Sequence, residues 1–199
     1  KYLTLDQSIN LLNSVDGDNK ERDYLILTLF LNCGLRLSEL CGLNLSDIRG
    51  DNTLKVTGKG NKERIVYLND ACKSAINNYL KDRPGNGVKN KNALFISRQK
   101  NRISKKTVQW VVYKYLEKIG IKGNEANGFS VHKLRHTAAT LMYQYGHVDI
   151  RVLKDVLGHE NLGTTEIYTH LSDKDIERAA LANPLSKIKS REAKKENET

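Results

Sequence analysis

The chain alternates apolar and polar side chains over residues 53–58 and 62–68, on the two sides of Gly58-Lys59-Gly60-Asn61. A two-residue period interrupted by a glycine-rich turn predicts a β-hairpin with Lys59 near its tip. Along most of the remaining chain, apolar residues recur with the spacing of amphipathic helices. The sequence therefore predicts a mainly α fold with one small antiparallel β-sheet, which is an α+β architecture.

Capping and glycine signals place the expected helices. Thr4-Leu5-Asp6-Gln7 is a capping box that opens the first helix, a second helix begins near Glu21, and Gly34 should end it. A short helix then places Arg36 and Glu39 three residues apart on one face. Further helices are expected over residues 70–80, 104–120, 130–145, 149–157, 162–170 and 173–182, with a short strand over residues 93–97.

Length and composition indicate a globular protein with room for one catalytic-sized domain or two small ones. The chain has 199 residues, of which 39% are hydrophobic and 28% are charged. No apolar run approaches the roughly 20 residues that span a bilayer, and no signal-peptide pattern opens the chain. The three cysteines form no C-x-x-C pair, which disfavours a disulfide framework or a zinc site and fits a reducing cytoplasm best.

Positive charge is concentrated in one segment. The formal net charge is +10, and residues 81–106 hold nine Lys or Arg and one Asp (9 − 1 = +8), whereas residues 1–50 are slightly acidic. Such a run can be a solvated surface, but its clustering favours a polyanion such as the DNA backbone. A membrane surface fits less well because the run lacks an apolar face. The predicted DNA-backbone contacts are Lys62, Arg64, Lys100, Arg102, Lys105 and Lys106.

A second set of residues, spread along the chain, carries the chemistry of phosphodiester cleavage. Attack on a DNA phosphodiester needs cations on the non-bridging oxygens, a proton donor for the leaving oxygen and an in-line nucleophile. Each residue alone also has an ordinary explanation, such as a surface ion pair, a turn lysine or a packing tyrosine. Together, in this order, they supply all three functions. The set is Arg36, Lys59, His132, Arg135, His159 and Tyr168.

Two other kinds of site are disfavoured. Gly58-Lys59-Gly60 lacks the G-x-x-x-x-G-K-[ST] spacing of a nucleotide P-loop, which argues against NTP hydrolysis. His132 and His136 lie four residues apart without the intervening glutamate of H-E-x-x-H, and no carboxylate cluster accompanies them. We therefore expect no metal and no cofactor, and we expect His136 to be a buried, hydrogen-bonded neighbour of the site.

The wording of the motifs resembles one family. Residues 57–64 (Thr-Gly-Lys-Gly-Asn-Lys-Glu-Arg), 132–137 (His-Lys-Leu-Arg-His-Thr) and 157–159 (Leu-Gly-His) are similar to motif blocks of the tyrosine recombinase (phage integrase) family. The chain most closely resembles the catalytic domain of bacterial Xer-like recombinases and integrases, over residues 1–185. The resemblance implies the tyrosine recombinase catalytic-domain fold.

That resemblance implies a role for each residue of the set. Tyr168 would be the nucleophile, forming a 3′-phosphotyrosyl bond and releasing a 5′-hydroxyl. Arg36 and Arg135 would clamp the non-bridging oxygens, Lys59 would protonate the departing 5′-oxygen, and His132 would exchange a proton with Tyr168.

His159 would donate a hydrogen bond to the phosphate, and Glu39 would orient groups of the site. The covalent intermediate conserves the bond energy, so neither ATP nor a divalent metal is needed. Religation to a different 5′-hydroxyl gives strand exchange through a Holliday junction.

The resemblance also implies partners and domain organisation. Double-stranded DNA would be bound by a homo-oligomer, a tetramer on paired sites, in the bacterial cytoplasm at the nucleoid. Helix 173–185 would dock either on a neighbouring protomer or on its own domain, and residues 186–199 would form a charged, flexible tail. An N-terminal core-binding domain would be absent from this chain.

Two other functions remain open at this stage. A type IB topoisomerase uses similar chemistry but relaxes DNA without synapsis. A non-catalytic DNA-binding protein would read duplexes through residues 149–170, which superficially resemble a helix-turn-helix.

Overall fold

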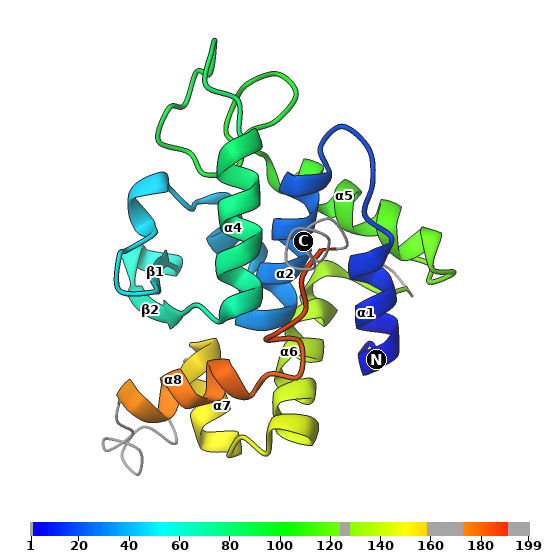
Figure 1. The fold of residues 1–199 in the computed structure, drawn as a ribbon, viewed down its shortest axis with the longest axis vertical. Coiled ribbons are helices and arrows are strands. Elements are labelled where there is room, and N and C mark those ends of the chain that lie inside the picture. The colour runs from blue at the N-terminus through cyan, green and yellow to red at the C-terminus, as the bar shows by residue number, and fades with distance from the viewer. Residues whose placement is uncertain (1, 124–127, 159–172, 191–199) are drawn as a thin grey trace, which may run out of the picture.

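The architecture is mainly helical, as the sequence predicts, and is shown here in a computed structural model that describes residues 2–123, 128–158 and 173–190 (Figure 1). A two-stranded antiparallel sheet lies at one side of the helices. The helices are α1 (Leu5–Asn13), α2 (Lys20–Cys33), α3 (Leu37–Cys41), α4 (Asp70–Asp82), α5 (Lys105–Lys118), α6 (Val131–Gly146), α7 (Ile150–Leu157) and α8 (Asp173–Ala182), the strands are β1 (Thr53–Thr57) and β2 (Glu63–Tyr67), and the short 3₁₀ turns are Leu45–Asp47 and Lys59–Asn61.

Local signals set the ends of the first helices. The Thr4 hydroxyl accepts the Gln7 backbone N–H at 3.1 Å while the Gln7 side chain accepts the Thr4 backbone N–H at 2.9 Å, which is the predicted capping box. Gly34 ends α2 in the left-handed conformation, with φ 60°. A Cβ at position 34 would lie 2.3 Å from the Leu157 side chain, so the absence of a side chain there also lets α7 approach.

The hairpin matches its prediction. Its register pairs Thr53 with Tyr67 and Thr57 with Glu63. The connecting 3₁₀ turn carries Gly60 at φ 69°, a conformation that glycine adopts without a Cβ penalty. Lys59 is exposed in this turn, at the end of the hairpin.

The core surrounds α2. All residues from Arg22 to Cys33 are buried, so this helix is enclosed on every side over most of its length. It packs against α4 and α6 most extensively and also contacts α1 and α5. A helix that is buried on all sides is a rigid central element, and it fixes the position of the residues that directly follow it, Gly34 to Arg36.

A smaller cluster joins α6, α7 and α8. It includes Met142 of α6, Leu153 and Val156 of α7 and Ala179 of α8. In this single chain α8 therefore packs on its own domain, and a buried Asn69 amide donates to the Ala180 carbonyl at 3.1 Å.

The chain stays packed beyond the boundary that we expected at residue 185. Leu185 is fully buried, Ser186 is buried with its carbonyl accepting the Ala71 N–H at 2.8 Å, and Ile188 packs against the core. We expected a flexible tail from residue 186, but its described part, residues 186–190, lies against the domain. Residues 191–199 lie outside the described residues.

Two further expectations differ from the structure or fall outside it. Residues 93–97 form no strand. They make only two isolated β-bridges, between Ala93 and Asn44 and between Ile96 and Arg102. The expected helix 162–170 lies outside the described residues. Within the described ranges, none of the helices combines the length and the apolar character needed to cross a bilayer.

Candidate functional site

Arg36 is held at the start of α3, directly after the turn that ends α2. It is the N-cap residue, and its backbone N–H donates to Glu39 Oε2 at 2.8 Å. Its guanidinium donates through Nη1 to Glu39 Oε1 at 3.1 Å, and the side chain is 40% exposed. The predicted pairing of these two residues is therefore present, and it fixes the guanidinium while leaving it accessible to an anion.

Glu39 is the buried counter-charge of the site. Its residue exposure is 2%, and Oε2 also accepts Arg64 Nη2 at 3.0 Å. Burial acts to raise the pKa of this carboxyl group, but the charge of Arg64, the Arg36 backbone N–H and the Arg36 guanidinium outweigh it, so the pKa of Glu39 lies below its ordinary value. Glu39 is therefore ionised at neutral pH and can orient two arginines.

Arg135 projects from α6 into the same cluster and is only 2% exposed. Its Nη1 donates to the Gly34 carbonyl at 2.6 Å, and its Nη2 donates to the Leu157 carbonyl. Burial and the neighbouring charges of Arg36 and Arg64 lower the pKa of Arg135 to about 10. The group remains protonated at neutral pH, so the cluster keeps its positive charge.

Arg64 was predicted to contact DNA, but it holds the site together from within. Besides its ion pair with Glu39, its Nη1 donates to the Val156 carbonyl at 2.5 Å, and its side chain is 17% exposed. A Cβ at Gly158 would lie 2.9 Å from Arg64 Cδ, so the side chain runs closely past the end of α7. With both ends of its guanidinium engaged inside the domain, Arg64 is a positioning residue.

The end of α7 is the common acceptor of the arginine cluster, which we define as Arg36, Arg64 and Arg135. Each member donates to a different carbonyl there. Arg64 bonds Val156, Arg135 bonds Leu157, and Arg36 Nη2 bonds the Gly158 oxygen at 3.1 Å. Cations at a helix C-terminus also interact favourably with the helix dipole. Position 159, predicted to carry a phosphate ligand, directly follows in sequence, but His159 and Tyr168 lie outside the described residues.

His132 lies one turn before Arg135 on α6 and is exposed. Partial burial, His136 and the charges of Arg135 and Arg36 lower the pKa of His132 below its ordinary value. The imidazole is therefore neutral at pH 7 and can accept a proton.

His136 was predicted to be buried, and this is wrong. It is exposed one turn along from His132, with the two rings edge to face at a centroid distance of 4.7 Å. The physical reason is helical phase, because Leu134, Arg135 and Ala138 occupy the inward face of α6.

Arg36 and His132 open onto one cavity of about 460 Å³, which α5 lines on its other side. Lys105 and Gln109, four residues apart on α5, contribute to this lining. Lys105 was predicted as a DNA contact, and it lines the same cavity as Arg36 and His132. Gln109 was not predicted, and no local pattern distinguishes it from other surface polar residues.

Lys59 is in the turn of the hairpin, directly after Gly58, which lies beside Glu39. A Cβ at Gly58 would be 3.5 Å from Glu39 Oε1, and the Gly58 N–H donates to the Lys62 carbonyl at 2.7 Å. The turn therefore lies within contact distance of Glu39, with Lys59 and Lys62 exposed beyond it.

The remaining predicted DNA contacts divide into two groups. The Arg102 guanidinium donates to the Cys41 and Leu43 carbonyls at 3.2 and 2.9 Å and to the Asn44 side chain at 2.5 Å, so it holds a loop instead of facing solvent. Lys100 is exposed, and its Nζ donates to the Asn86 carbonyl at 2.7 Å. Lys105 and Lys106 are exposed in the first turn of α5.

Among the described residues, no group of three or more His, Cys, Asp or Glu is arranged to hold a metal ion.

Fold and site together define a mainly helical domain in which a buried carboxylate orients two arginines of a cluster beside an open cavity. The phage integrase family model matches residues 1–175, and the chain belongs to this family. It is 59% identical to tyrosine recombinase XerC of Caldanaerobacter subterraneus subsp. tengcongensis over 93% of this chain and 51% of that protein. It is 37% identical to tyrosine recombinase XerA of Pyrococcus horikoshii over 90% of this chain and 60% of that protein.

Solved structures give the same result for the fold. The crystal structure of XerA recombinase superposes with a TM-score of 0.69 at 31% identity, covering 88% of this chain and 62% of that one. XerH site-specific recombinase bound to palindromic difH substrate, in a post-cleavage complex, superposes with a TM-score of 0.67 at 28% identity over 91% and 52%. The chain therefore has the tyrosine recombinase catalytic-domain fold, and it spans about half to two thirds of the length of these relatives.

Proposed function

We propose that residues 1–185 form the catalytic domain of a site-specific DNA recombinase that cleaves and rejoins strands through a 3′-phosphotyrosyl intermediate. The observation that carries the proposal is the arginine cluster on Glu39, opening beside a neutral His132. Curated relatives named tyrosine recombinases, and a relative crystallised on its DNA substrate after cleavage, support it further.

The residues divide the chemistry according to how firmly they hold their protons. Arginine keeps its charge at every relevant pH, so Arg36 and Arg135 supply fixed stabilisation of the phosphate. His132 accepts the phenolic proton of Tyr168 as that oxygen attacks phosphorus, and Lys59 donates a proton to the departing 5′-oxygen. His159 donates a hydrogen bond to a non-bridging oxygen.

Arg135 is enclosed within the domain before a phosphate binds. Its Nη1 and Nη2 each donate one bond, to the Gly34 and Leu157 carbonyls, which leaves further N–H groups of the guanidinium for a phosphate, and the residue is 2% exposed. Arg36, at 40% exposure, is the first group that a phosphate meets. A phosphate on the remaining N–H groups of Arg135 would lie close to the Leu157 carbonyl, so substrate binding and the position of the α7 end are linked through this side chain.

Double-stranded DNA is the proposed partner, contacted through its backbone by Lys62, Lys100, Lys105 and Lys106. Such contacts position a protein without reading sequence. We further propose a homotetramer on paired sites, in which α8 leaves the cis position seen in this chain and docks on a neighbouring protomer. The site of action is bacterial chromosomal DNA, in the cytoplasm.

Strand exchange between two duplexes tests recombinase against topoisomerase. Duplexes are first selected for binding from a random pool, and two differently labelled copies of one selected site are then incubated with the protein. Recombinant duplexes or Holliday junctions are the expected products. Relaxation of a supercoiled plasmid without exchange would instead assign a type IB topoisomerase.

A further inference from the structure

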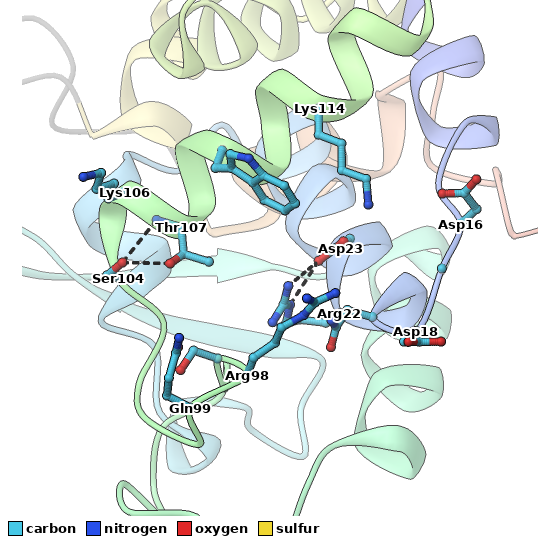
Figure 2. Close-up of a pocket in the computed structure, with 14 residues that line it drawn as sticks. Asp16, Asp18, Arg22, Asp23, Arg98, Gln99, Ser104, Lys106, Thr107 and Lys114 are labelled. Carbon is cyan, nitrogen blue, oxygen red and sulfur yellow. Dashed lines mark hydrogen bonds and ion pairs between the residues drawn. The ribbon is translucent and has the colours of Figure 1, made fainter.

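A second cavity, of about 600 Å³, lies on the neighbouring stripe of α5 (Figure 2). Its lining comes from the segment before α2, the first turn of α2, one side of α5 from its N-cap to Lys114, and the loop around Arg98. It shares no lining residue with the cavity that holds Arg36 and His132. It is therefore separate from the catalytic cavity, and of its lining residues only Lys106 is also a proposed DNA-backbone contact.

An exposed aromatic surface forms the apolar part of this cavity. Trp110 is 59% exposed, and the Lys114 Nζ lies 5.5 Å from its ring centroid. Lys106, Trp110 and Lys114 are spaced by four residues, so they form one stripe along the helix. A large exposed tryptophan is a common energetic anchor of protein interfaces.

The charged groups around the ring leave an excess of positive charge. No acidic side chain of the described residues forms an ion pair with Arg98, Lys106 or Lys114, which surround the cavity in Figure 2. The acidic lining is largely neutralised, because Asp23 pairs with Arg22 at 3.0 Å and Asp16 pairs with Lys118 at 2.5 Å.

Helix dipoles add to this positive potential. The first turns of α2 and α5 both face the cavity, and Asn19, the N-cap residue of α2, makes no side-chain capping bond. Asp18 is the one lining carboxylate that is exposed without an ion pair among the described residues. The cavity thus favours a ligand that carries several negative charges around a flat apolar group.

The size of the cavity separates the possible anions. A volume of about 600 Å³ suits a few side chains. A duplex presents its phosphates on a broad convex surface and keeps its bases stacked inside, so it offers nothing flat to the indole. An acidic protein segment can place carboxylates on the three cations and an aromatic side chain on Trp110.

We propose that this cavity is a docking site for an acidic segment of a partner protein with an aromatic anchor residue. The anchor stacks on Trp110, and the flanking carboxylates bind Arg98, Lys106 and Lys114. This inference is independent of the proposed strand cleavage, since none of the three cations belongs to the catalytic set.

Trp110 is the only tryptophan of the chain, so its fluorescence reports binding directly. The probe is the peptide acetyl-Asp-Glu-Phe-Asp-Glu-amide, titrated at low salt into the full chain. Two comparison peptides replace phenylalanine by alanine or all four acidic residues by lysine. A saturable change in emission is expected with the probe, and binding should be about tenfold weaker or more without the ring or with reversed charge.

Variants separate this site from general electrostatics. Arg98→Glu/Lys114→Glu should weaken peptide binding about tenfold or more, whereas Lys89→Glu/Lys91→Glu, with the same charge change outside the cavity, should not. Circular dichroism confirms that each variant is folded. The proposal is overturned by no saturable change up to millimolar peptide, by equal binding of the lysine peptide, or by equal losses in the two variants. It is also overturned if dAMP displaces the peptide and quenches Trp110 more strongly.

Discussion

Replacing Glu39 by glutamine removes the counter-charge of the arginine cluster while keeping the shape of the side chain. The carboxylate accepts the Arg36 backbone N–H at 2.8 Å, Arg36 Nη1 at 3.1 Å and Arg64 Nη2 at 3.0 Å. In Glu39→Gln the amide oxygen can keep the bonds at Oε2, but the amide nitrogen then faces Arg36 Nη1, donor against donor. The variant loses one hydrogen bond outright and the charge assistance of the others.

The expected loss of stability follows from these contacts. Hydrogen bonds to charged groups contribute roughly 1.5–3 kcal/mol and neutral ones roughly 0.5–1.5 kcal/mol. Because Arg36 is 40% exposed, solvent screens part of its share. We expect a loss of about 2–3 kcal/mol in the free energy of unfolding, or a drop of roughly 5–10 °C in Tm for a chain of this length.

Urea unfolding of Glu39→Gln beside Glu63→Gln checks this value. Glu63 is 58% exposed and pairs with Lys55 at 3.5 Å, so its replacement should change stability by less than about 0.5 kcal/mol. Sulfate should restore stability more to Glu39→Gln than to the control, because an anion can replace the missing charge among three arginines. Equal stabilities of the two variants, or equal effects of sulfate, would refute the assignment of Glu39 as the counter-charge.

Three further predictions test other parts of the site. Gly34→Ala should destabilise the protein by about 2 kcal/mol or more in urea, because φ is 60° and the new Cβ would lie 2.3 Å from the Leu157 side chain; a neutral effect would contradict the close packing of α7. The pKa of His132 lies below its ordinary value, so the neutral base predominates at neutral pH, and cleavage rates should fall as the pH drops below this lowered pKa. His132→Gln should abolish this dependence and slow cleavage by about 10²-fold or more. Lys105→Ala should reduce the slope of log binding constant against log salt by about 1, whereas Arg102→Ala should leave the slope unchanged and lower the urea midpoint; the opposite pattern would return Arg102 to the DNA surface.

The parts of the fold that can be predicted from the sequence are those determined by interactions between residues close together in the chain. The capping box at Thr4, the left-handed Gly34 and the glycine-rich turn of the hairpin each act over a few positions, and each is present as predicted. Glu39 was also placed correctly, because its partner Arg36 is only three residues away.

The errors concern groups whose partners are distant in sequence. Arg64 and Arg102 were predicted to be exposed cations in basic segments. Folding brings them acceptors from 92 and 61 residues away, the Val156 and Cys41 carbonyls respectively. The helical phase of α6 decides whether His136 faces the core or solvent. Because histidine occurs on both the buried and the exposed faces of helices, its identity does not settle that phase. Arg135 was predicted as a phosphate ligand, and its enclosure by the Gly34 and Leu157 carbonyls, which the sequence did not indicate, arises from packing between α2, α6 and α7.

The most direct test of the proposed activity is capture of the covalent intermediate. Binding-selected duplexes with a nick close to the cleavage position lose the short 5′-hydroxyl fragment and cannot be rejoined. On a denaturing gel, the chain should form an adduct to the 3′ end of the cleaved strand, without ATP or added metal, and Tyr168→Phe should form none while binding DNA equally well. An adduct that persists in Tyr168→Phe, or binding without any adduct under all conditions, would contradict tyrosine-mediated cleavage by this domain.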